Sequence, residues 1–338
     1  MVYEWFHKTE TDRIFYEEHI KERLPVKILD AHVHMNRMEH VKGVSRERIA
    51  MDWALECGLH MDYEASQIYY GAIFPDREVE RIAFPFPLPE VDIPGNNTYL
   101  AGLAQKKRIY ALMSVRPEWT PEYCEQVLMQ NPFAGFKPYP YLASPVKGAD
   151  ISIYDFMPKE QLAVLDRHKK AMVLHLPRKG RLPAPDNIKE LREIRQAYPD
   201  IRIILAHYGR CFTAQMLQKG TKDLGEDLNG FYFDTAAVVN PDVHKLALET
   251  LDSSRILYGT DFPIMTWHGC REWHSDTPSN YCREAFSWNH HEKKEEEDSF
   301  TYIAYVQLKN MLDAIGEDEG LREKIFYKNA AEAFQIEG

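Results

Sequence analysis

Short runs of apolar residues alternate along this chain with longer segments in which apolar residues recur at helical spacing. The runs are rich in Ile, Val, Leu, Phe and Tyr and end at polar residues, Gly or Pro, which is typical of strands buried on both faces of a parallel sheet. They comprise residues 26–34, 67–74, 108–115, 133–139, 171–175, 201–207, 230–235 and 255–261. The segments between them that read as helices include residues 45–57, 121–129, 158–168, 186–198 and 241–251, and several begin with Ser, Asp or Pro.

Eight strands that alternate with helices predict an α/β fold of the (β/α)8 TIM-barrel type. A doubly wound open sheet is the alternative, but no Gly-rich phosphate loop follows any of the runs. Residues 75–105 contain five prolines, and residues 262–300 are rich in Trp, His and charge. We expect these stretches to be long loop insertions after strands 2 and 8. With an N-terminal extension over residues 1–25, they complete a single domain of residues 1–338.

The amino-acid composition limits the classes of binding partner and the cellular compartment that we expect for this protein. The 338 residues carry a net charge of −11, which argues against a nucleic-acid partner because such proteins need a basic face. Five cysteines without a Cys-x-x-Cys pair suit a reducing compartment. The first residues do not resemble a signal peptide, and no apolar run approaches the roughly 18 residues of a membrane-spanning helix. We therefore expect a cytoplasmic protein without membrane or nucleic-acid partners, and the sequence leaves homo-oligomerisation open.

Histidine and aspartate residues close several of the predicted strands. His32 and His34 are two apart and share one face of the first strand, while His175, His207 and Asp261 end the fifth, sixth and eighth strands. A single strand-final histidine is more often a hydrogen-bonded core residue than a ligand. The carboxyl ends of barrel strands converge on one point, however, so the combination predicts a divalent metal site.

The chain resembles the amidohydrolase superfamily, and more closely its amidohydrolase-2 branch of metal-dependent hydrolases and decarboxylases. The matching segments are LDAHVH at 29–34, GFK at 135–137, LYGTDFP at 257–263 and KIFYKNA at 324–330, together with the histidines that end strands 5 and 6. The resemblance implies that His32, His34, His175 and Asp261 hold one divalent ion, with zinc expected and manganese as the alternative. It also implies that His207 polarises the substrate and that Asp261 acts as general base.

The resemblance leaves three roles open for Lys137: a carboxylated bridge between two metals, a group that pairs with substrate or a metal ligand, or a structural lysine. We expect a single metal, with Lys137 near the substrate. Tyr139, Arg116 and Arg178 are further candidates for binding a carboxylated substrate, because they follow predicted strands. Exposed loop charge is the alternative for each arginine. Other candidates are the cations Lys179, Arg181 and Arg210 and the aromatic residues Tyr69, Tyr70, Trp267 and Trp273.

The leading functional hypothesis is a metal-dependent hydrolase that cleaves a C–N bond or a lactone or ester C–O bond in a small carboxylated molecule. A non-oxidative decarboxylase of an aromatic or unsaturated acid on the same single-metal site is the alternative. A binding barrel that retains its ligands without turnover is a third hypothesis, because the fold alone does not specify chemistry.

Overall fold

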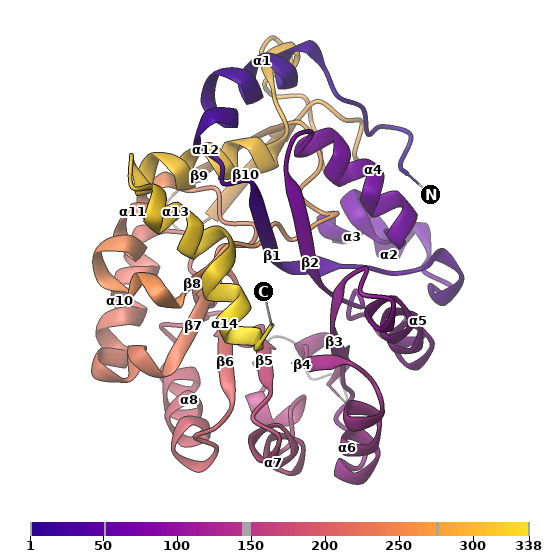
Figure 1. The fold of residues 1–338 in the computed structure, drawn as a ribbon. Coiled ribbons are helices and arrows are strands. Elements are labelled where there is room, and N and C mark those ends of the chain that lie inside the picture. The colour runs from indigo at the N-terminus through magenta and orange to yellow at the C-terminus, as the bar shows by residue number, and fades with distance from the viewer. Residues whose placement is uncertain (1, 51, 144–149, 275–276, 337–338) are drawn as a thin grey trace.

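The computed structural model describes residues 2–50, 52–143, 150–274 and 277–336. Eight parallel strands lie in sequence order around a barrel, with helices between them (Figure 1). The strands are β1 Lys27–His34, β2 Glu78–Phe84, β3 Tyr110–Ser114, β4 Phe133–Lys137, β5 Ala171–Leu174, β6 Arg202–Leu205, β7 Phe231–Asp234 and β8 Ile256–Leu257. The backbone after β8 returns to β1, where Asp261 N donates to His32 O at 2.9 Å and His34 N to Phe262 O at 2.8 Å. These bonds close the predicted (β/α)8 barrel.

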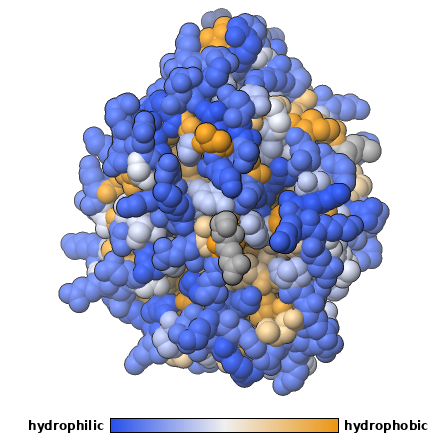
Figure 2. All heavy atoms as spheres, in the orientation of Figure 1, coloured by the Kyte–Doolittle hydropathy of each residue, from blue (hydrophilic) through white to orange (hydrophobic). Residues whose placement is uncertain are grey.

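Helices lie between and around the strands. They are α1 Glu10–His19, α2 Arg46–Ala50, α3 Trp53–Gly58, α4 Tyr63–Ile73, α5 Ile93–Gln105, α6 Pro121–Gln130, α7 Lys159–Arg167, α8 Pro185–Ala197, α9 Ala206–Arg210, α10 Ala214–Leu224, α11 Pro241–Thr250, α12 Ile303–Ile315, α13 Glu319–Glu323 and α14 Asn329–Phe334. No helix in the described ranges combines the length and apolarity needed to cross a membrane. Apolar residues on the face shown in Figure 2 lie in small groups among hydrophilic ones.

The prediction of the second strand is wrong. Residues 67–74 lie mostly in α4, whose N-terminus is capped by Asp62 accepting a hydrogen bond from Ala65 N at 2.7 Å. A short continuous apolar run does not distinguish a buried strand from a buried helix. The true β2 begins with the polar residues Glu78 and Glu80 because its first half is not buried. Residues 75–105 are therefore not a loop insertion: they contain β2 and α5, and Pro94 lies in the first turn of α5, where proline is well tolerated.

The stretch after β8 is elaborated. It contains the antiparallel hairpin of β9 Gly269–His274 and β10 Thr277–Cys282, followed by turns up to α12. The N-terminal extension contains α1, which lies beside this region in Figure 1. A buried histidine joins the two segments, since His268 lies with Nε2 2.9 Å from Asp12 Oδ2 and Nδ1 2.6 Å from Glu284 Oε1.

Two apolar clusters divide the core. One fills the barrel, with Leu29, Ile82, Val173 and Ile204 among its members, and the other lies between the strands and the surrounding helices. Phe334 and other residues of α14 join the interior cluster, so the last helix covers the amino-terminal opening of the barrel. This helix does not cover the opposite opening, at the carboxyl ends of the strands, where a functional site can form.

Candidate metal centre

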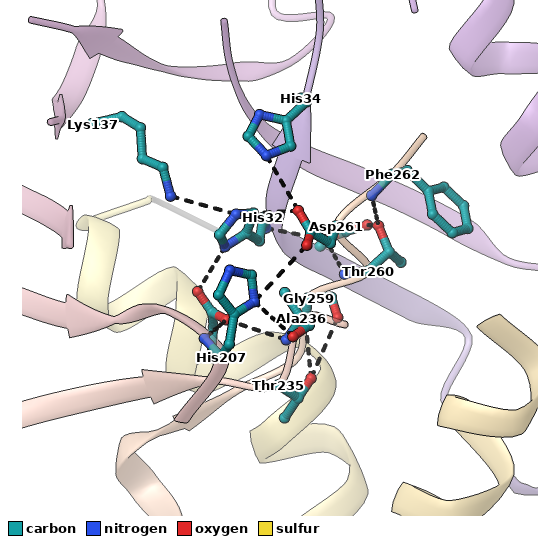
Figure 3. Close-up of polar contacts among 12 residues, drawn as sticks. His32, His34, Lys137, His207, Thr235, Ala236, Gly259, Thr260, Asp261 and Phe262 are labelled. Carbon is teal, nitrogen blue, oxygen red and sulfur yellow. Dashed lines mark hydrogen bonds and ion pairs between the residues drawn. The ribbon is translucent and has the colours of Figure 1, made fainter. Parts of the chain in front are cut away.

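Four predicted site residues meet at the carboxyl end of the barrel (Figure 3). Asp261 Oδ1 lies 3.2 Å from His34 Nε2 and 3.5 Å from His32 Nε2, and Asp261 Oδ2 lies 3.9 Å from His207 Nδ1. Each of these side chains is buried. One ligand atom from each of His32, His207 and Asp261 lies within 4.8 Å of the other two, which is a spacing that can hold a metal ion.

A change of register in β1 aims the histidines inward. Leu29 and Ala31 face the barrel interior, so strict alternation would place the even-numbered His32 outside. The pairing of β1 with β2 shifts between Asp30 and Val33, and Val33 packs in the outer cluster. The shift therefore reverses the alternation and turns His32 and His34 toward the metal centre.

Asp234, the last residue of β7, fixes two of the histidines. His32 Nδ1–H donates to Asp234 Oδ2 at 2.8 Å, which leaves His32 Nε2 free to face Asp261. Asp234 Oδ1 accepts from the backbone N–H of His207 at 2.8 Å and of Ala236 at 3.1 Å. A carboxylate behind a histidine ligand orients the ring and raises its basicity. Sequence reasoning missed Asp234, although its position at the end of a predicted strand was the same signal that identified Asp261.

His207 is positioned by an unusual turn. Residues His207, Tyr208, Gly209 and Arg210 all have left-handed backbone conformations, with φ between 50° and 68°. His207 Nδ1–H donates to Ala236 O at 2.7 Å, so Nε2 is the nitrogen available as an acceptor. The turn bends the chain immediately after β6 and directs the imidazole into the centre.

Electrostatics suit a divalent cation here. Burial lowers the pKa of His32 and His34 and lowers the pKa of His207 to about 4, so the three rings are neutral at pH 7 and able to act as ligands. Burial opposes ionisation of Asp261, but the surrounding imidazoles outweigh it and hold the pKa of this carboxyl below its ordinary value. Asp261 Oδ1 is buried and accepts no hydrogen bond from the described residues. An orphaned carboxylate oxygen beside neutral imidazoles is the donor set that Zn²⁺ or Mn²⁺ would satisfy.

His175 lies at the edge of this centre. Its half-buried ring is 5.2 Å from the His207 ring and 4.5 Å from the Tyr139 ring, between centroids. It falls outside the group of three closest ligands, as does His34. His207, expected to act only on the substrate, is inside that group.

Lys137 ends β4 and is fully buried next to the histidines. Its Nζ lies 3.4 Å from His32 Nε2 and 4.4 Å from the centre of the Phe84 ring. Burial lowers the pKa of Lys137 to about 8 against the opposing effect of Asp234 and Asp261. In the described chain no carboxylate lies within 4.0 Å of this ammonium group. No ion pair neutralises its positive charge, which therefore contributes to the electrostatic potential at the candidate metal centre.

A cavity of about 250 Å³ opens onto the centre. Its lining includes His34, His175, His207 and Asp261 with the aromatic residues Trp53, Phe86, Tyr139, Tyr141, Phe212 and Trp273 and the cations Arg181, Arg210 and Arg271. Of the other aromatic candidates, Tyr69, Tyr70 and Trp267 are buried in the core.

Two predicted substrate residues lie elsewhere. Arg178 donates to Glu190 Oε1 at 2.5 Å and to Asn187 Oδ1 at 2.6 Å, and Arg116 donates to Glu118 Oε1 at 2.6 Å. Neither lines the cavity. The expectation that residues following the strands line the site identified the correct end of the barrel. Side chains at that end also point outward to neighbouring loops, however. Arg271 was missed because it belongs to the hairpin after β8.

Known structures with the same fold include three instructive cases. The 2,6-dihydroxybenzoate decarboxylase from Rhizobium matches with a TM-score of 0.59 at 15% identity, over 93% of this chain and 100% of the other. A 5-carboxyvanillate decarboxylase from Novosphingobium aromaticivorans, complexed with manganese and 4-hydroxy-3-methoxy-5-nitrobenzoic acid, matches at 0.57 and 14%, over 94% and 97%. A probable 2-pyrone-4,6-dicarboxylic acid hydrolase from Acinetobacter baumannii, with citric acid bound, matches at 0.53 and 12%, over 91% and 99%.

A search of curated proteins by sequence gives no significant match. The family model described as amidohydrolase, however, matches residues 162–336, which is just over half of the chain. The matched segment runs from α7 to the end of α14 and contains His175, His207, Asp234 and Asp261. His32 and His34 lie before it and meet it in space at Asp261. The chain belongs to the amidohydrolase family and is an enzyme.

Proposed function

We propose that this enzyme is a divalent-metal-dependent decarboxylase that acts on a small, ring-bearing carboxylic acid. The observation that carries the proposal is the unbonded, buried Oδ1 of Asp261 among His32, His34 and His207, at the base of a cavity walled by aromatic side chains. The volume of about 250 Å³ is below the roughly 300–1,000 Å³ of pockets for drug-sized ligands, which favours a one-ring substrate.

The apolar wall favours loss of carbon dioxide. Phe86, Phe212 and Tyr139 line the space next to the centre, and a ring bound against them would leave little room for water. A carboxylate deprived of water is destabilised relative to a transition state in which its charge spreads into the ring and neutral carbon dioxide forms. Of the three similar structures described above, two are decarboxylases, one of 2,6-dihydroxybenzoate and one of 5-carboxyvanillate, and the second is complexed with manganese.

His32, His207 and Asp261 would hold the ion, with His34 and His175 completing its surroundings. When bound, a divalent ion supplies a fixed positive charge that polarises a substrate oxygen. Tyr139 and Phe86 orient the ring. As the bond to the carboxyl carbon breaks, carbon dioxide leaves and the electron pair stays on the ring carbon, which takes up a proton; Asp261, ionised at rest, relays that proton from solvent to the ring. Lys137 balances the negative charge that gathers beside His32.

The direct test is release of carbon dioxide from a panel of hydroxylated benzoates by enzyme reconstituted with Mn²⁺ and, separately, with Zn²⁺. Asp261→Asn should lose at least about 100-fold in kcat, because removing the proton carrier removes general acid–base catalysis worth about 10²–10⁴. Turnover of these substrates without gas release would exclude decarboxylation, and full activity of Asp261→Asn would exclude the assigned role of the carboxylate.

Hydrolysis of a C–N or lactone bond is the second candidate. The same free oxygen of Asp261 favours it, because a carboxylate in that position can accept a proton from an attacking water. A hydrolytic product from a lactone or amide panel, with Asp261→Asn inactive and no gas evolved, would select this reaction over the first.

A further inference from the structure

The hairpin after β8 contributes one cation to the cavity wall. Arg271 lies on β9 opposite Asn280 of β10, and both residues line the cavity. The hairpin also places Trp273 there, stacked on Phe212 at 6.2 Å between ring centroids. An element outside the eight βα units therefore forms part of the substrate's surroundings.

The guanidinium of Arg271 is held firmly without being neutralised. Nε donates to Asn280 Oδ1 at 2.6 Å, Nη1 donates to Ala237 O at 3.1 Å, and the group lies 5.4 Å from the centre of the Trp53 ring. All of these partners are uncharged. Within the described ranges no carboxylate lies within 4.0 Å of it, and Nη2 donates to no protein acceptor. Burial lowers the pKa of Arg271 only to about 10, so the side chain stays charged at neutral pH.

Arg210 is in a similar state on the same cavity. Nη1 donates to the carbonyl of Leu176 at 2.8 Å, and among the described residues no carboxylate lies within 4.0 Å of the guanidinium. Two arginines outside the cavity are instead paired with carboxylates, Arg178 with Glu190 and Arg116 with Glu118. A partly buried charge without a counter-ion is costly unless an anion completes the site.

We propose that Arg271, together with Arg210, forms a subsite that selects substrates with a second anionic group in addition to the carboxyl group at the metal centre. The substrate class is then a one-ring dianion such as a benzene dicarboxylate. This inference rests on the proposed function for the position of the first carboxyl group and deepens it by specifying a second. The planar, five-donor guanidinium matches a carboxylate better than a lysine ammonium would.

The test is equilibrium binding by calorimetry to full-length, Mn²⁺-loaded enzyme. The probes are benzene-1,3-dicarboxylate and 3-carbamoylbenzoate, which have nearly the same shape but differ by one negative charge. We expect the wild type to bind the dicarboxylate at least about tenfold more tightly, as one charge-assisted contact provides. Equal affinities in the wild type would overturn the proposal without any variant.

Variants then locate the subsite. Arg271→Gln should reduce the preference about tenfold or more while leaving the affinity for 3-carbamoylbenzoate unchanged, and Arg271→Lys should restore part of it. Arg116→Gln, an arginine outside the cavity, is the matched control and should keep the full preference. A folded Arg271→Gln enzyme with undiminished preference would refute the assignment. Because binding needs no turnover, charge selectivity without gas release would count against the decarboxylase and not against the subsite.

Discussion

Replacing His268 with glutamine should remove a pH-dependent share of the protein's stability. The imidazole is completely buried between Asp12 of α1 and Glu284 of the segment after β10, and it joins the N-terminal extension to that segment. Burial alone lowers the pKa of His268, but the hydrogen bonds and charges of the two carboxylates outweigh it and raise the pKa to about 9. The folded protein therefore holds a proton that the unfolded chain releases near 6.5.

The size of the effect follows from these two values. At 1.36 kcal/mol per pH unit, the interval from 6.5 to about 9 corresponds to about 3 kcal/mol. A raised pKa in the folded state means that this contribution is complete below pH 6.5. It declines as pH rises and is lost once pH passes about 9.

The assay is urea denaturation followed by tryptophan fluorescence, from pH 6 to pH 9.5, on wild type and His268→Gln. Taking the difference between the two curves cancels groups they share, such as Lys137. The difference in free energy of unfolding should shrink by about 3 kcal/mol across this range. His291→Gln is the control, since that imidazole bonds to Glu297 on the surface and should change stability by less than about 0.5 kcal/mol. Parallel curves for wild type and His268→Gln would refute the reasoning.

Three further predictions concern the site and its scaffold. Asp234→Asn should weaken metal binding by about 10–100-fold in competition with a chromogenic chelator, because His32 loses its orienting carboxylate; unchanged affinity would contradict this. Gly135→Ala should lower the free energy of unfolding by about 1–3 kcal/mol or more, because the new Cβ would lie 1.9 Å from the carbonyl oxygen of Ala171. The urea midpoint should fall accordingly, and an unshifted midpoint would disprove that contact. Dialysis against dipicolinate should abolish activity and Mn²⁺ or Zn²⁺ should restore it, whereas activity retained without metal would rule out the metal-dependent mechanism.

The barrel could be predicted from the sequence because buried parallel strands are short, apolar and evenly spaced. Prediction failed at the second strand for a physical reason. The run containing Tyr69, Tyr70 and Ile73 packs as one face of α4, whereas β2 starts with charged residues at the exposed rim. Hydrophobicity reports burial, and it identifies a strand only where the backbone period is also visible.

That the candidate metal ligands lie close together could also be predicted from the sequence. His32 lies near the end of β1, and His207 and Asp261 follow β6 and β8, so the three converge because parallel strands share one carboxyl edge. The register shift in β1 was not readable, since it depends on pairing with β2. The roles of the arginines could not be predicted from the sequence either. Arg178 forms an ion pair with Glu190, 12 residues away in sequence, and Arg271 reaches the cavity because it lies on a hairpin.

The left-handed turn after β6 has a thermodynamic consequence. Three of its four residues, His207, Tyr208 and Arg210, carry a Cβ atom, and each such residue costs roughly 1–2 kcal/mol in this conformation. The sum is comparable with a large part of the about 5–15 kcal/mol that stabilises a typical folded protein. Selection of variants for heat resistance alone should therefore favour changes that relax this turn, and selection for turnover should retain it. In this turn, the backbone geometry that positions His207 lowers the stability of the folded enzyme.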